Sequence, residues 1–264
     1  EAFSKSVLFG FEIVETTEKG FLIDITDFLM QDTHGVTDVL KSNKQGNYSV
    51  DLSRSALNLE RTKSFPKNVD FDVLITLKGS PLGQEIRSVT PDAKYITVFQ
   101  HHSFVELPDN NFVPRISHPN SGSITTSFMN YSAPIDGEMK VKYSWRHRLE
   151  KKDPTAAISE AKEPIVYYLD NGTPEPVRSA LIEGAGWWNE AFKEIGYKNA
   201  FQVKILPDSV DPLDVRYNVI QWVHRSSRGW SYGGGVVDPR TGEIIKGHVS
   251  LGSLRVRQDY KIAK

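Results

Sequence analysis

The chain has 264 residues, of which 39% are hydrophobic and 25% charged, and its 32 basic and 33 acidic residues leave a formal net charge of −1. This length suits one large or two medium domains with a real core, and the charge balance argues against a nucleic-acid-binding protein. No run approaches the ~18 apolar residues that a membrane span needs. The absence of cysteine excludes disulfides, thiolate metal sites and a cysteine nucleophile.

The first part of the chain is predicted to be a β-rich accessory domain over residues 1–155. Segments rich in β-branched and aromatic residues alternate with turns rich in Asp, Asn, Gly and Pro, a pattern typical of strands and loops. The predicted strands span residues 9–14, 20–28, 71–77, 95–107 and 141–149.

A second domain is predicted over residues 163–264, after a charged, proline-containing linker. A short strand at 165–169 precedes a helix expected at 174–195, with Thr173 as N-cap and Gly196 as the C-terminal glycine. Steps of three and four place its apolar residues on one face, namely Val177, Leu181, Ala185, Trp188, Phe192 and Ile195.

Four further strands are predicted after this helix. They span residues 201–206, 217–223, 233–237 and 243–251, the last two forming a hairpin around the turn at 238–242. The sequence therefore indicates an α+β protein, in which a β-rich domain is followed by a mixed sheet with one long backing helix.

The histidine spacing argues against a zinc site in this chain. A zinc-protease helix needs His-Glu-x-x-His, because positions i and i+4 share one helix face. No such pair exists among His34, His101, His102, His118, His147, His224 and His248. The adjacent His101 and His102 lie in a predicted strand, where neighbours point to opposite faces. We expect these histidines to be structural or exposed.

Residues 229–233 match the G-x-S-x-G pattern of serine hydrolases. That motif requires a strand-to-helix turn that exposes the serine. Here Gly234, Gly235 and Asp238-Pro239 follow, which cannot start a helix. We interpret the match as coincidental and the segment as a glycine-rich bend between strands.

Several motifs resemble those of large bacterial zinc-dependent metalloproteases of the metzincin type. Three lie in the second half, at residues 164–170 (PIVYYLD), 187–192 (WWNEAF) and 237–244 (VDPRTGEI). Three others, at 64–69 (SFPKNV), 101–108 (HHSFVELP) and 145–154 (WRHRLEKKDP), resemble the uncharacterised domain that precedes the protease in that family.

The resemblance implies a catalytic half that begins with strand, helix, strand, strand, edge strand and strand, followed by a zinc-binding helix with the motif H-E-x-x-H-x-x-G-x-x-H. That helix is expected beyond Lys264, so this chain is expected to be an inactive fragment of a zinc-dependent metalloendopeptidase. Zinc is expected in the full-length parent only, and the fragment should contribute no catalytic or metal-binding residue. A secreted, periplasmic or outer-membrane location is implied, with the signal segment preceding Glu1.

The same alignment makes residues 233–237 the edge strand that binds a peptide or protein substrate. The predicted substrate-binding residues are Gly233, Gly234, Gly235, Val236 and Val237. Consecutive glycines let a foreign backbone approach closely, and an edge strand offers unpaired N–H and C=O groups. The alternative is that the glycines form a flexible loop.

A second interpretation is a non-catalytic module that binds glycan or protein at a cell surface. Trp145, Tyr131 and Phe112 are candidates for an aromatic platform, although aromatic residues in β-rich domains commonly belong to the core. An H-E-x-x-H motif soon after Lys264 would decide for the protease.

Overall fold

The computed structural model describes residues 9–225 and 230–264, and it confirms an α+β fold with a β-rich N-terminal region. The chain separates into two compact units, residues 1–105 and 106–264. The boundary expected from sequence, between 155 and 163, lies inside the second unit. Residues 106–152 belong to that unit because they contact the hairpin formed by residues 232–252. For example, Arg146 forms a bridge with Glu243 of that hairpin.

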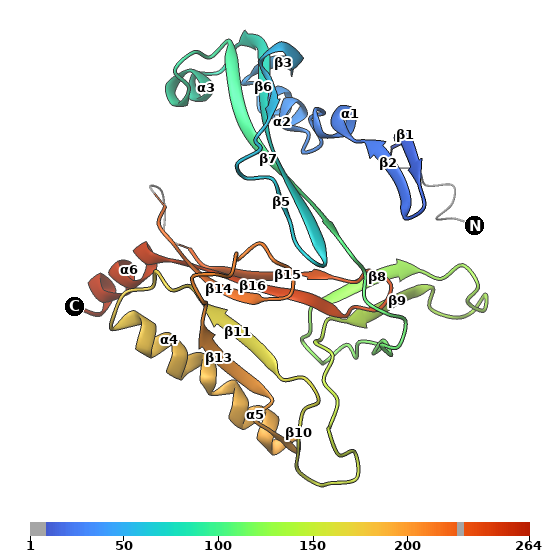
Figure 1. The fold of residues 1–264 in the computed structure, drawn as a ribbon. Helices are drawn as coiled ribbons and strands as arrows, with labels where there is room; N and C mark the ends of the chain where they lie inside the picture. The colour runs from blue at the N-terminus through green and yellow to red at the C-terminus, as the bar shows by residue number, and fades with distance from the viewer. Residues whose placement is uncertain (1–8, 226–229) are drawn as a thin grey trace. The chain divides into compact units, whose positions relative to one another are not determined.

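The first unit is built on one long strand, β6 (Asn68–Pro81), visible as the central ribbon of this unit in Figure 1. β7 (Tyr95–Val105) runs antiparallel to it along one side. Along the other side three shorter strands follow one another, β3 (Gly46–Val50), β4 (Ala56–Leu57) and β5 (Lys63–Ser64). A separate hairpin pairs β1 (Glu12–Thr17) with β2 (Gly20–Asp24).

Short helices, which the strand pattern did not predict, cover the core of the first unit. They are α1 (Thr26–Leu29), α2 (Val36–Ser42), the 3₁₀ turn η2 (Leu52–Arg54) and α3 (Gln84–Val89). The buried core beneath them joins β6, β7 and the helices, and consists of Leu29, Val73, Ile75, Leu77, Ile86 and Ile96. Burial of these apolar side chains is the main force that holds the unit together.

The second unit begins with the antiparallel hairpin of β8 (Thr125–Met129) and β9 (Lys140–Ser144). Its main element is a five-stranded mixed sheet. The strand order is β13 (Phe201–Ile205), β11 (Ile165–Leu169), β14 (Asn218–Val223), β16 (Ile244–Gly252) and β15 (Tyr232–Val237). All neighbours are parallel except β15 and β16, which form the expected hairpin. Two further short strands, β10 (Ser159–Glu160) and β12 (Tyr197–Lys198), pair in parallel.

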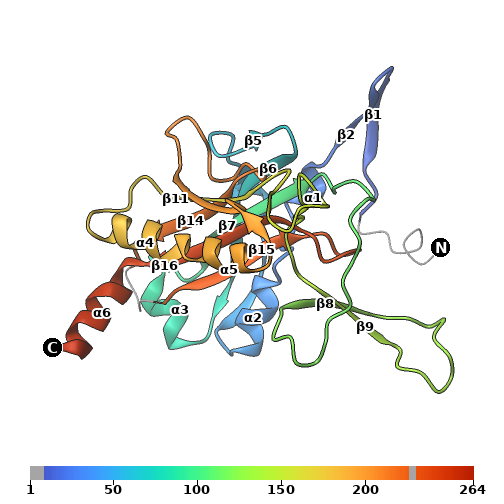
Figure 2. The same cartoon turned by 90° about the horizontal axis from the view of Figure 1, so that it is seen from below.

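The backing helix is divided in two, which corrects the single helix expected at 174–195. α4 (Val177–Gly186) and α5 (Trp188–Glu194) meet at Trp187 and follow one face of the sheet in both views (Figures 1 and 2). Gly184 and Gly186 lie in the last turn of α4, where glycine weakens a helix.

The ends of this helical segment also differ in part from expectation. Thr173 does not cap α4, since its hydroxyl donates to the Asp170 carbonyl oxygen and the helix starts after Pro176. At the other end Gly196 has the left-handed φ of 87° that a C-terminal glycine commonly adopts, which confirms that expectation.

A last helix, α6 (Ser253–Ala263), starts directly after β16. Its residues that face solvent include Val256, Tyr260 and Ile262. Within residues 9–225 and 230–264, no helix is long and apolar enough to cross a membrane.

Candidate functional site

The predicted substrate strand is part of β15 and lies at the edge of the sheet. β16 pairs with it on one side, with Gly233 opposite Val249 and Gly235 opposite Gly247, and the strand order ends there. Residues 233–236 are exposed and Val237 is half-buried. The structure therefore brings the five predicted residues together on one strand, whose outer side pairs with no strand in the part of the chain that the structure describes. The loop alternative does not describe this segment.

The three glycines of β15 differ in whether the structure has room for a side chain at their positions. A β-carbon at Gly235 would lie 2.6 Å from the Lys246 carbonyl oxygen of β16, so the sheet itself requires glycine there. At Gly234 a β-carbon would meet nothing within 4 Å, and at Gly233 only the His248 carbonyl oxygen at 3.9 Å. The face of the sheet above Gly233 and Gly234 is thus open, and neither residue places a side chain there.

The G-x-S-x-G match falls partly outside the described residues, which do not include Gly229. Ser231 is followed by β15 rather than by a helix, and its hydroxyl accepts a hydrogen bond from the Gly252 N–H at 3.3 Å. His248 is bonded instead to Gln221, with 3.1 Å between Nε2 and Oε1. Trp230 and Ser231 precede β15, and the glycines at 233–235 lie in that strand rather than in the expected bend.

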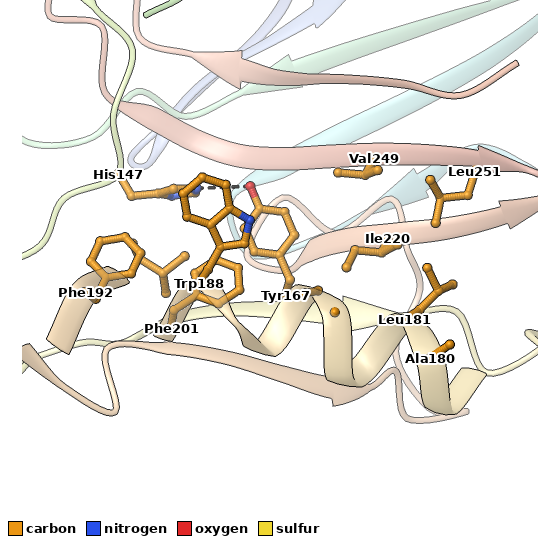
Figure 3. Close-up of a pocket in the computed structure, with 13 residues that line it drawn as sticks. His147, Tyr167, Ala180, Leu181, Trp188, Phe192, Phe201, Ile220, Val249 and Leu251 are labelled. Atoms are coloured by element: carbon orange, nitrogen blue, oxygen red, sulfur yellow. Dashed lines mark hydrogen bonds between the residues drawn. The ribbon is translucent and has the colours of Figure 1, made fainter. Parts of the chain in front are cut away.

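An apolar cavity of about 450 Å³ lies between α4, α5 and the sheet (Figure 3). No residue of α4 or α5 is fully buried, and Trp188 at its border is 62% exposed. The lining is almost entirely apolar and comes from both layers, as in Leu181, Trp188, Phe192, Ile220, Val249 and Leu251. The helix and the sheet therefore leave an apolar groove that neither of them fills.

The cavity contains one polar pair, formed by His147 and Tyr167. Figure 3 shows the two side chains pointing toward one another, with 3.2 Å between His147 Nε2 and the Tyr167 hydroxyl. Burial lowers the pKa of His147 to about 4, so the ring is neutral at pH 7. Burial also raises the pKa of Tyr167, so its hydroxyl stays protonated.

Tyr167 reaches its position because β14 and β16 leave room beside it. It pairs with Asn218 of β14, whose side chain accepts from the Gly247 N–H at 2.7 Å and donates to the Val166 carbonyl at 2.9 Å. A β-carbon at Gly247 would overlap the Tyr167 hydroxyl and lie 2.7 Å from Cζ. Gly247 is thus required by the tyrosine, and its partner across the hairpin is Gly235.

The remaining histidines are dispersed. His101 contacts Asp70, with 3.1 Å between Nε2 and Oδ1, whereas the His102 ring lies near those of Phe28 and His34. Across residues 9–225 and 230–264, no three His, Cys, Asp or Glu side chains are close enough to hold a metal ion. The described residues therefore do not fit a zinc site.

The three aromatic residues of the binding-module interpretation do not share one environment. Phe112 is buried beneath the Arg146 guanidinium, and Trp145 donates from its indole to Thr126 at 2.7 Å. Tyr131 is 84% exposed in the loop between β8 and β9. No observation in this part of the chain favours a platform made of all three.

The cavity residues were missed from the sequence. His147 lies in a segment that looks like the approach to a linker, and Tyr167 looks like one more apolar strand residue. The available signal was the isolated glycine at 247 inside a strand pattern, which commonly indicates a close approach of another group.

Comparison with known proteins gives one result. A family described as "Domain of unknown function (DUF5117)" matches residues 1–152. Neither the curated proteins nor the solved structures contain a match.

Proposed function

The chain belongs to the DUF5117 family, and we propose that it forms the N-terminal part of a zinc-dependent metalloendopeptidase in which β15 binds the substrate peptide. The observation that carries the proposal is that β15 ends the strand order of its sheet, so that no described strand pairs with its outer side. Gly233 and Gly234 also place no side chain on this strand. A peptide added there as a sixth strand is held by main-chain hydrogen bonds, which suits an enzyme that cleaves many sequences.

The order of elements supports this proposal. Along the chain the five-stranded sheet and its backing helices run β11, α4 and α5, β13, β14, β15 and β16, and within this sheet only β15 is antiparallel to its neighbour. This is the strand, helix, strand, strand, edge strand, strand order of the metzincin-type proteases that the sequence resembles.

The apolar cavity is evidence that another element of the full protein packs on the face of the sheet that carries α4 and α5. Its lining of Leu181, Ile220 and Val249 matches the apolar side of an amphipathic helix rather than bulk water. On β15 and β16, Gly233, Gly235 and Gly247 alternate onto that same face and present no side chain. We assign the groove to the zinc-carrying helix of the full protein.

The zinc ligands are not assigned to this chain. α6 contains no histidine, and the described residues do not form a metal cluster. In the proposal this chain binds and orients the peptide and supplies the sheet, and the full reading frame should contain H-E-x-x-H beyond Lys264. A reading frame without that motif would contradict the proposal.

The role of β15 is tested by replacing Gly233 and Gly234 separately with proline in the full-length protein. Successive N–H groups of a strand point to opposite sides, so one replacement removes an N–H that faces β16 and the other removes one at the free edge. Both positions have space for a β-carbon, whereas Gly235 does not. We expect the free-edge variant to fold, to retain its zinc and to lose peptide hydrolysis.

The control is Gly10→Ala, at a position with open space around a β-carbon and no left-handed φ. Unchanged hydrolysis in both proline variants, with folding and zinc content intact, would show that the substrate does not lie along β15.

A further inference from the structure

We propose that Arg148, a residue of the segment that matches the family, is a positioning residue that orders the substrate strand β15. It acts through a group of five charged side chains around the turn between β15 and β16, which we call the arginine clasp: Arg148, Arg240, Asp109, Asp238 and Glu243.

Arg148 joins two acids from distant parts of the second unit. Its Nε and Nη2 donate to the two carboxylate oxygens of Glu243 at 2.7 and 2.9 Å, and Nη1 and Nη2 donate to Asp109 at 3.1 and 2.8 Å. Glu243 is 6% exposed, so Arg148 takes the place of water as a hydrogen-bond donor to its carboxylate. Fork-to-fork pairs of this kind are stronger and more directional than single ion pairs.

Arg240 holds the other side of the same turn. It bonds the carboxylate of Asp238, which is fully buried, with 2.7 Å between Nη2 and Oδ2. It also donates to the Pro108 carbonyl oxygen at 3.0 Å and to the Asn110 side chain at 3.1 Å. The turn is thus fastened at both sides to residues 108–110.

The backbone continues this attachment. The Arg146 N–H donates to the Gly242 carbonyl at 3.1 Å, and the Ile244 N–H donates to the Arg146 carbonyl at 2.9 Å. Gly242 has φ of 77°, and a β-carbon there would lie 2.9 Å from the Ser144 carbonyl oxygen. Residues 144–148 therefore lie against the turn as an additional strand-like segment.

β15 needs such support because its own sequence favours disorder. Its three glycines lose more conformational entropy on ordering than any other residue type, and among the described strands β16 alone pairs with it. The turn at 238–243 directly follows the C-terminal end of β15 and connects it to β16. Fixing that turn therefore fixes one end of the strand. A strand already ordered in its bound shape binds a peptide at lower entropic cost.

The ordering of β15 is independent of catalysis, whereas its value for binding a peptide rests on the proposed function. The test is hydrogen–deuterium exchange of the 264-residue chain, read at residues 232–237 and, for comparison, at β11 and β14. The variants are Arg148→Gln and Asp109→Asn, the second at an exposed position that leaves the Glu243 pair intact. Arg255→Gln, which removes an exposed ion pair of α6, is the matched control.

We expect Arg148→Gln to accelerate exchange at residues 232–237 by roughly tenfold, with a smaller acceleration for Asp109→Asn and none for Arg255→Gln. Exchange in β11 and β14 should stay as in the parent. Unchanged exchange at 232–237 in both clasp variants, or equal acceleration throughout the sheet, would overturn the proposal. If Arg148→Gln does not fold, selective acceleration in Asp109→Asn supports it and its absence overturns it.

Peptide hydrolysis by the full-length protein gives a second reading. There, Arg148→Gln should raise KM several-fold and leave kcat unchanged, because the arginine clasp acts on substrate binding. Arg148→Lys should raise KM less than Arg148→Gln does, since lysine keeps the positive charge but lacks the planar guanidinium that bonds both carboxylates. A fall in kcat with unchanged KM would contradict the positioning role. A full-length protein that cleaves no peptide would instead refute the proposed function, and the exchange result would still decide the ordering of β15.

Discussion

Acidification should destabilise the second unit through His147, the buried ring beside Tyr167. The pKa of this group falls from 6.5 to about 4 because burial disfavours its charged form. The unfolded chain therefore binds a proton that the folded chain does not, and acid favours unfolding. The contribution of His147 to stability is fully present above about pH 6.5 and is lost as the pH falls toward 4. At about 1.4 kcal/mol per pKa unit, the loss at pH 4 is about 3 kcal/mol.

The measurement is urea unfolding at pH 7 and pH 4, followed by tryptophan fluorescence. All five tryptophans, Trp145, Trp187, Trp188, Trp222 and Trp230, belong to the second unit, so the signal reports on that unit. His147→Gln removes the titrating group and keeps a hydrogen-bonding side chain.

Between pH 7 and pH 4 the parent chain should lose about 3 kcal/mol more than the His147→Gln variant. His118→Gln, at a histidine outside the buried core, is the matched control and should keep the parent's difference between the two pH values. An equal loss in the parent and in His147→Gln would refute the reasoning.

Two further predictions concern the same cavity and the dispersed histidines. Gly247→Ala should lower the free energy of unfolding by about 1–3 kcal/mol in urea titrations, because the added β-carbon would overlap the Tyr167 hydroxyl. The control Gly234→Ala, in open space, should change the free energy of unfolding by less than about 0.5 kcal/mol. Equal effects of the two variants would contradict the packing argument. The purified chain, dialysed against a weak chelator, should hold no stoichiometric zinc by elemental analysis; one zinc per chain would direct attention to His101, His102 and His118.

The five-stranded sheet of the second unit was predictable from sequence because its signals are local. The apolar run at 165–169 and the strand at 233–237 are bounded by residues that end strands, and both lie where the pattern placed them. The helix was misjudged at its middle, because a continuous apolar face does not show that Gly184 and Gly186 interrupt it. In the first unit α2 was missed, although Asp32 precedes it and accepts from the N–H groups of Val36 and Thr37.

The candidate site was only partly predictable, and the reason is distance along the chain. A glycine-rich edge strand is visible in the sequence itself. The pairing of His147 with Tyr167, and of Arg148 with both Asp109 and Glu243, depends on how separate segments fold together. No periodicity within a short window carries that information.

The segment from 106 to 152 has a consequence for how this protein is divided. By sequence it belongs with the family domain that ends at 152, yet it folds with residues 153–264, for example through the ion pair of Arg148 with Glu243. A family boundary records which residues are inherited together, whereas a folding boundary records which residues need one another. In this chain the two boundaries lie at 152 and 105, so the physically sound place to divide it is after Val105.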